Sequence, residues 1–144
     1  MRALASYVGK QETTTPGAEP LDRAGEVGVN PFPHWRGTGQ VNYDGTTFGA
    51  FLQGRFVGGG RYDITRGPDV VALQQIPAQA YLDGQISYKG AFRGANVELF
   101  LNVRNILNND PPFAPQSGNI PVAVNTTLHD VLGRVFRVGA KFRF

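Results

Sequence analysis

The sequence predicts an all-β protein, an antiparallel up-and-down meander of about six strands that forms part of a transmembrane β-barrel. Segments of about ten residues alternate apolar and polar side chains, and long connections alternate with short ones. The last segment, 133–144, places Phe136, Val138, Phe142 and Phe144 on one side and cationic residues on the other. Successive side chains of a strand point to opposite faces, so this segment has one lipid-compatible face and one polar face.

The first expected strand, 1–10, is weak and its facing is ambiguous, because small and apolar residues occupy both parities. The polar segment 11–33 follows. It carries repeated Pro and Gly residues, which interrupt both helices and strands, and it is therefore expected to be a long loop.

The next two expected strands, 34–43 and 46–58, form a hairpin. The dipeptide Asp44-Gly45 between them is a strong signal for a tight hairpin turn. Apolar residues of the second strand share one parity, with Phe51 as the exception.

A second hairpin is expected from strands 79–89 and 95–107, joined by a short turn, with Phe100 as the residue of unexpected facing. A long loop, 59–77, precedes it, and residues 70–73 could form a short turn of helix within that loop. Another long loop, 108–132, leads to the last strand, 134–144. The order of connections is that of outer-membrane barrels, whose extracellular loops are long and periplasmic turns short.

Composition excludes several classes of protein. The 144 residues have a net charge of +3, and the cations are spread along the chain, so a nucleic-acid partner is not expected. The sequence contains no run of about 18 apolar residues, so a membrane-spanning helix is not expected. Residues 1–10 do not resemble a signal peptide. Since an outer-membrane protein must be exported, the chain is expected to be the tail of a longer one, the alternative being a mature chain.

Two stretches resemble the C-terminal end of TonB-dependent outer-membrane receptors. Residues 99–108 (LFLNVRNILN) are similar to the family's penultimate strand, which typically ends in an Asn-Leu-Phe-Asp-like sequence. Residues 129–136 (HDVLGRVF) resemble the family's Tyr-Asp-x-x-Gly-Arg-x-Phe lead into the last strand, with His129 in place of Tyr.

The resemblance implies that residues 1–144 are the C-terminal segment of a receptor barrel of roughly 22 strands with a plugged lumen. It implies a location in the outer membrane of a Gram-negative cell and a part in energy-coupled uptake of a siderophore or another nutrient. The implied partners are outer-membrane lipid, the barrel-assembly machinery and the rest of the receptor chain. The plug is absent, and TonB would be contacted through the missing N-terminal region.

Candidate functional residues fall into three groups. The apolar residues of the last strand would form an assembly signal: Phe136, Val138, Phe142 and Phe144. Polar residues expected to face the lumen, where they contact substrate or plug or form a charge ladder, are Arg36, Gln53, Arg55, Asp83, Glu98 and Arg104. Loop residues that are plausible ligand contacts are Arg61, Tyr62, Arg66 and Phe113.

No enzyme is expected, because the sequence lacks an arrangement of nucleophile and base. No cofactor is expected either. The histidines His34 and His129 have no accompanying ligand cluster, which argues against a metal site. Two alternatives remain: an oligomeric outer-membrane barrel or adhesion protein, and a soluble β-sandwich binding module, since a sandwich gives the same alternation with its apolar side inward.

Overall fold

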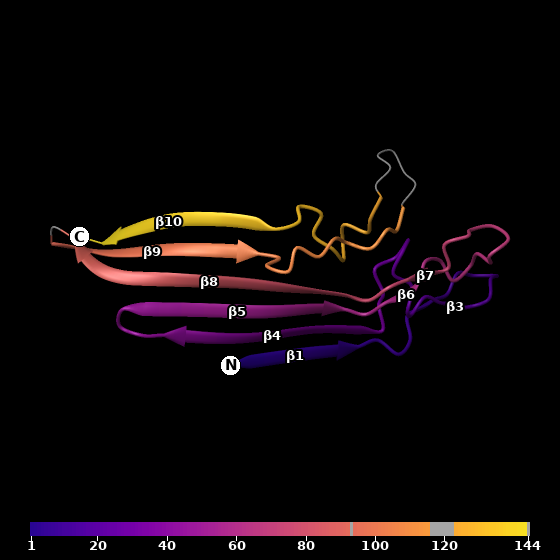
Figure 1. Ribbon diagram of the computed structural model, residues 1–144. Helices are drawn as coiled ribbons and strands as arrows, with labels where there is room; N and C mark the ends of the chain where they lie inside the picture. Colours follow the sequence, from indigo (N-terminus) through magenta and orange to yellow (C-terminus); the bar gives the residue numbers. More distant parts are fainter. Residues whose placement is uncertain (93, 116–122, 144) are drawn as a thin grey trace.

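The computed structural model describes residues 1–92, 94–115 and 123–143, and its main element is one six-stranded antiparallel sheet (Figure 1). The strand order β1-β4-β5-β8-β9-β10 follows the sequence, which confirms the predicted all-β meander. The strands are β1 (Arg2–Tyr7), β4 (Trp35–Asp44), β5 (Phe48–Val57), β8 (Gln79–Phe92), β9 (Ala95–Arg104) and β10 (Val135–Arg143).

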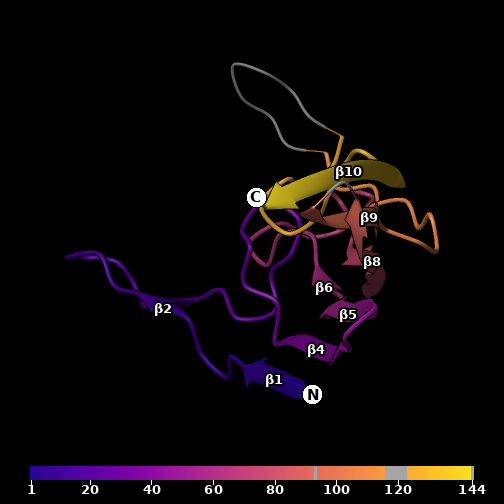
Figure 2. The same cartoon turned by 90° about the vertical axis from the view of Figure 1, so that its left-hand side faces the viewer.

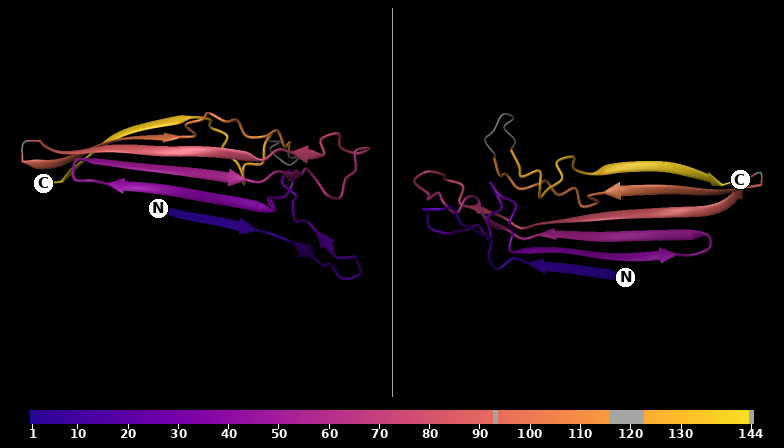
Figure 3. Two further views of the ribbon diagram at one scale, coloured as in Figure 1. Left: turned by 60° about the horizontal axis from the view of Figure 1, so that its bottom comes forward. Right: turned by 180° about the vertical axis from the view of Figure 1, so that it is seen from behind.

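The sheet is curved, and β1 and β10 lie at its two edges without pairing with each other (Figure 2). It is therefore not closed into a barrel. The three long loops gather at one end of the strands, called here the loop end, and the two hairpin turns lie at the opposite end, the turn end (Figure 3). No helix among the described residues is long and apolar enough to cross a membrane.

Some predicted boundaries were wrong. Strand β8 continues to Phe92 instead of ending at residue 89, because its last residues still pair with β9. Strand β9 ends at Arg104 instead of 107, because Asn105 has a positive φ of 51°, which takes the backbone out of the extended region. In place of the helical turn suggested at 70–73, a single hydrogen-bonded turn links Gly67 to Val71, whose N–H lies 3.0 Å from the Gly67 carbonyl oxygen.

The long loops contain short paired strands that the sequence did not predict. In the first loop, β2 (Glu12–Thr13) pairs with β3 (Leu21–Asp22). In the second loop, β6 (Gly60–Arg61) pairs with β7 (Gln75–Ile76). Two-residue strands have no periodicity to detect, which explains why sequence patterns missed them.

The strand register gives the sheet one apolar and one polar face. Val41, Leu52 and Gly84 are successive cross-strand partners on the apolar face, and Gln40, Gln53 and Asp83 are successive partners on the polar face. The register also settles the facing of β1, whose Ala3, Ala5 and Tyr7 lie on the apolar face.

Phe51 and Phe100 lie on the polar face. The Phe100 ring lies over Gly139, its direct partner on β10, where an added Cβ would come within 2.4 Å of the ring. Glycine at this position therefore makes room for an aromatic ring on an otherwise polar surface.

Most of the buried apolar residues lie at the loop end. Val57 from the end of β5, Ile76 from β7 and four loop residues form the core cluster, whose members are Val27, Val57, Tyr62, Ile76, Ala114 and Leu128. All three long loops contribute to this loop core, so they pack on one another instead of extending separately.

Candidate functional site

The apolar face has three zones along the strands. Aromatic side chains lie near the loop end at Tyr7, Trp35, Phe56 and Phe136, and near the turn end at Tyr43, Phe48, Tyr88 and Phe142. Aliphatic side chains lie between the two, at Val41, Leu52, Ile86, Leu101 and Val138. Trp35 and Tyr43 are eight residues apart, about 26 Å along an extended strand. This length matches the apolar band of about 25 Å on transmembrane barrels.

This face is exposed along its whole length. The exposed fractions are 82% for Val138, 61% for Ile86 and 46% for Leu52, although these side chains sit in the middle of their strands. Among the described residues no second sheet or helix covers them. Exposed apolar surface of this extent marks a face that contacts something other than water.

Three ion pairs connect strands on the polar face. Arg55 on β5 binds Asp83 on β8 through two hydrogen bonds, Nε to Oδ2 at 2.7 Å and Nη2 to Oδ1 at 3.2 Å. Lys89 pairs with Asp44, and Lys141 with Glu98 at 3.5 Å. The Arg55–Asp83 and Lys141–Glu98 pairs join adjacent strands, as in the charge ladder that the sequence allowed, whereas Lys89 on β8 reaches past β5 to Asp44 on β4.

The residues that carry the family resemblance connect β9 to β10. The side-chain amide of Asn105 binds the backbone of Asn109 twice, donating to its carbonyl at 2.9 Å and accepting from its N–H at 3.1 Å. Asp130 pairs with Arg104 at 2.6 Å. Gly133 has a φ of +64°, a conformation that disfavours side chains, and allows the chain to turn into β10. The conformation of the loop base thus explains why these residue types stand at these positions.

His129 joins the third loop to the polar face of the sheet. It is buried, and its Nδ1 lies 3.0 Å from the hydroxyl oxygen of Tyr81 on β8. Burial lowers the pKa of His129 below its ordinary value, and the positive charge of Arg36 lowers it further. The imidazole is therefore held in its neutral form, and no carboxylate pairs with it among the described residues.

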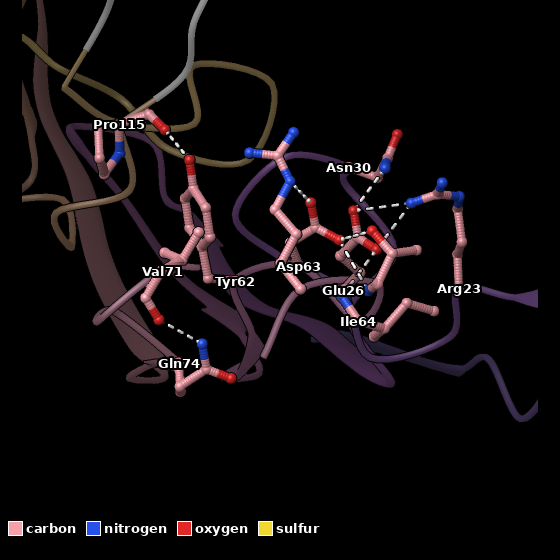
Figure 4. A network of polar contacts seen from close by, with 11 residues as sticks. Arg23, Glu26, Asn30, Tyr62, Asp63, Ile64, Val71, Gln74 and Pro115 are labelled. Atoms are coloured by element: carbon pink, nitrogen blue, oxygen red, sulfur yellow. Dashed lines mark hydrogen bonds and ion pairs between the residues drawn. The ribbon is translucent and has the colours of Figure 1, made fainter. Parts of the chain in front are cut away.

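The loop end also contains a buried polar network around Glu26 (Figure 4). The Glu26 carboxylate is inaccessible to solvent and accepts hydrogen bonds from the side chains of Arg23 and Asn30 and from the backbone N–H of Ile64. The Arg23 Nη1 atom lies 3.0 Å from Glu26 Oε2. A buried carboxylate is tolerated when it is paired and hydrogen-bonded in this way, so Glu26 connects the first loop to the second.

Asp63 is the second carboxylate of this region. Its Oδ1 accepts hydrogen bonds from the Thr65 backbone at 2.8 Å and the Thr65 hydroxyl at 2.6 Å, and Arg66 lies 3.1 Å away. Burial works to raise the pKa of Asp63, but the Thr65 hydrogen bonds and the charges of Arg66 and Arg23 outweigh it and lower the pKa. The carboxylate therefore stays ionised.

The four loop residues considered as ligand contacts are not equivalent. The Tyr62 ring is buried in the loop core, and its hydroxyl donates a hydrogen bond to the Pro115 carbonyl (Figure 4). Arg66 binds Asp63, and the backbone of Arg61 pairs with Gly25 and Val27. Phe113 is 63% exposed. Of the three whose side chains reach solvent, Phe113 presents the largest apolar surface.

The remaining sequence-predicted residues divide between the two faces. Those expected in the lumen all lie on the polar face, at Arg36, Gln53, Arg55, Asp83, Glu98 and Arg104. Of the expected assembly signal, Phe136, Val138 and Phe142 lie exposed on the apolar face, whereas Phe144 is outside the described residues.

Sequence reasoning missed Glu26, Asn125 and Tyr81 as organising residues. Glu26 and Asn125 stand in loops without periodicity, and the Asn125 amide binds the carbonyls of Val27 and Gly28, almost a hundred positions away. Only a signal of long-range pairing would have identified them. Tyr81 was placed correctly on a strand, but nothing local indicates its hydrogen bond with His129.

The described residues contain no group of three or more His, Cys, Asp or Glu side chains placed to hold a metal ion. Comparisons with protein-family models, curated proteins and solved structures found no match to this chain. The features of the chain that bear on its function are therefore the two faces of the sheet, the loop end and the short motifs.

Proposed function

We propose that this chain forms the C-terminal strands of an outer-membrane β-barrel of the TonB-dependent receptor type, which takes up a siderophore or another scarce nutrient. The zoned apolar face carries the proposal. Two aromatic zones bound an aliphatic zone, the pattern of barrel strands that contact the interfaces and the hydrocarbon of a bilayer. Lipid would cover the exposed side chains of this face.

The polar face and the loop end support the same assignment. The polar side chains of all six main strands share the face opposite the lipid, where they would line the lumen. The loops form a folded cap at one end, where an extracellular ligand would first be met. The motifs at 99–108 and 129–136 support the choice of the receptor family. Plug, further strands and TonB contact would come from the rest of the receptor.

The exposed apolar row of β10 supports a role for Phe136, Val138, Phe142 and Phe144 as the signal for barrel assembly. An unpaired edge strand must be recognised before closure protects it. This role is compatible with lipid contact, because assembly comes first and burial in lipid follows.

Trp35 provides the experiment, because it is the single tryptophan of the chain and lies in the loop-end aromatic zone. In lipid vesicles, Trp35 fluorescence is expected to be quenched more strongly by lipids brominated near the headgroup than by lipids brominated near the acyl end. In the double variant Trp35→Phe, Leu52→Trp, the deep bromines should quench more strongly. In Trp35→Phe, Gln53→Trp, neither should quench strongly, since Gln53 faces the other way.

The outcomes separate the competing functions. Equal quenching of the Leu52→Trp and Gln53→Trp variants, or a monomer that stays soluble without detergent, would favour a β-sandwich module. A heat-stable oligomer of this chain alone in detergent would favour the oligomeric barrel. For the uptake role, deletion of residues 134–144 from the reading frame that encodes the chain should abolish energy-dependent uptake of the receptor's nutrient.

A further inference from the structure

The charged residues of the six main strands are confined to the polar face. By register this face carries eight cations: Arg2, Arg36, Arg55, Lys89, Arg104, Arg137, Lys141 and Arg143. It carries three carboxylates, Asp44, Asp83 and Glu98. This excess of positive charge attracts anions to the face.

The three carboxylates are already engaged. Asp83 binds Arg55, Asp44 binds Lys89 and Glu98 binds Lys141. Arg104 takes its partner, Asp130, from the third loop. The cations left without a carboxylate among the described residues are all arginines, namely Arg2, Arg36, Arg137 and Arg143.

One of these arginines lines a cavity. At the turn end, Lys89 reaches back to the first hairpin, binding the Asp44 carboxylate and lying 3.2 Å from the Gly45 carbonyl oxygen. The backbone N–H of Lys89 also donates to the Thr47 carbonyl at 2.7 Å. A cavity of about 590 Å³ lies here, and its polar lining comprises Asp44, Thr46, Lys89, Asn96, Glu98, Lys141 and Arg143.

The cavity retains uncommitted hydrogen-bond donors. Arg143 and Asn96 are direct cross-strand partners on β10 and β9, so their side chains start about 5 Å apart. Neither side chain, nor the Thr46 hydroxyl, binds another of the described residues. A guanidinium beside an amide offers the planar array of N–H groups that suits a carboxylate or a phosphate.

We infer that this cavity binds a solute carrying carboxylate or phosphate oxygens, with Arg143 as its main anchor and Asn96 beside it. The inference rests on the proposed function and specifies it: the nutrient, or its complex, is anionic. In the proposed orientation the turn end faces the periplasm, so the cavity is the last anion site along the lumen wall.

The test uses the chain in detergent micelles and titration calorimetry with citrate, inorganic pyrophosphate and sucrose. Citrate or pyrophosphate should bind, sucrose should not, and raising the salt concentration should weaken binding. Arg143→Gln should weaken binding about tenfold, the loss expected for a charge-assisted bidentate contact. Arg2→Gln is the matched control, because Arg2 has no carboxylate partner and shares the polar face but lies on the opposite edge strand. It should change binding less than about twofold.

Comparison of the two small anions identifies whether carboxylate or phosphate is preferred. Failure of both to bind, or equal losses for Arg2→Gln and Arg143→Gln, would overturn the inference. Binding of a polyglutamate peptide without binding of either small anion would overturn it in favour of an acidic protein partner. Trp35 quenching in both variants checks that they fold, and it tests the membrane proposal independently of anion binding.

Discussion

The strands and the loops of this protein differ in burial in the opposite sense to most proteins. In the strands, large apolar side chains such as Val138, Phe136 and Ile86 are more than half exposed. In the loops, which normally lie on the surface, Val27, Tyr62 and even the charged Glu26 are buried. The loop end is stabilised within the chain, whereas the apolar face of the sheet is left uncovered by the described residues. The difference shows that the exposure of a side chain can be interpreted only once the surroundings of its face are known.

A charge placed on the apolar face should have the largest effect. Leu52→Arg puts a guanidinium in the middle of the proposed lipid-facing zone, and we expect a loss of about 2–4 kcal/mol in the free energy of unfolding from vesicles. Gln53→Arg, one residue along on the polar face, should be close to neutral. Urea titration in lipid vesicles measures both. Equal effects would break the distinction between the two faces.

Removing the buried carboxylate should destabilise the loop end alone. Glu26→Ala leaves the Asn30 amide and the Ile64 N–H without their acceptor, at an expected cost of about 1–3 kcal/mol. Hydrogen exchange should accelerate at Val27 and Tyr62, while exchange in β5 and β8 stays unchanged. Faster exchange throughout the sheet would mean that the two regions are not independent.

The attachment of the third loop should depend on pH. The pKa of His129 in the folded protein lies below its unfolded value. The unfolded state therefore binds the proton first. The contribution of the neutral His129 side chain to the free energy of unfolding is lost as the pH falls below about 6.5. The protection of the Leu128 and His129 amides from hydrogen exchange, corrected for the intrinsic exchange rate, should fall at pH 5.

His129→Tyr is the matched variant for this effect, because it places at 129 the residue type usual in the resembling motif and removes the titration. The variant should show no such loss of amide protection near pH 5. An identical pH response in both proteins would assign the effect to a group other than His129.

The smallest effect is expected from an exposed ion pair of the polar face. Lys141 is 57% exposed and its Nζ lies 3.5 Å from the Glu98 carboxylate. Lys141→Gln should therefore reduce the free energy of unfolding by about 0.5 kcal/mol or less. A larger loss in the vesicle titration would mean that the ion pairs of the polar face contribute substantially to holding the strands together.

Local chemistry made the sheet predictable. The alternation in residues 34–43 and the nearby Asp44-Gly45 dipeptide predict a hairpin without information from elsewhere in the chain, and the register confirms the hairpin. The position of the tight turn was wrong, because Asp44 still pairs with Gly49 and the chain reverses between Gly45 and Phe48. The end of β8 was missed because Ala91 and Phe92 are followed by no distinctive turn residue before Gly94. The faces of the main strands could be predicted because a strand has a fixed period of two.

The loop end could not be predicted in the same way. Glu26 acquires its role from Asn30 and from Ile64, and Tyr62 from Pro115, which is 53 positions along the chain. His129 could be recognised as a departure from the Tyr usual in the motif that residues 129–136 resemble, but its contact with Tyr81 follows from the way the third loop folds over β8. Such pairings have no local pattern, so the candidate ligand contacts chosen for their position in the loops included a core residue.

The hydrogen bonds from Asn125 to the carbonyls of Val27 and Gly28 also bear on the order of folding. They join segments nearly one hundred residues apart, and contacts of such separation form slowly because a long chain segment must first be closed. The hairpins β4–β5 and β8–β9 need no such closure. The loop core should therefore form last, after all six strands are in register. A completed loop core would then indicate that the whole sheet has been assembled correctly.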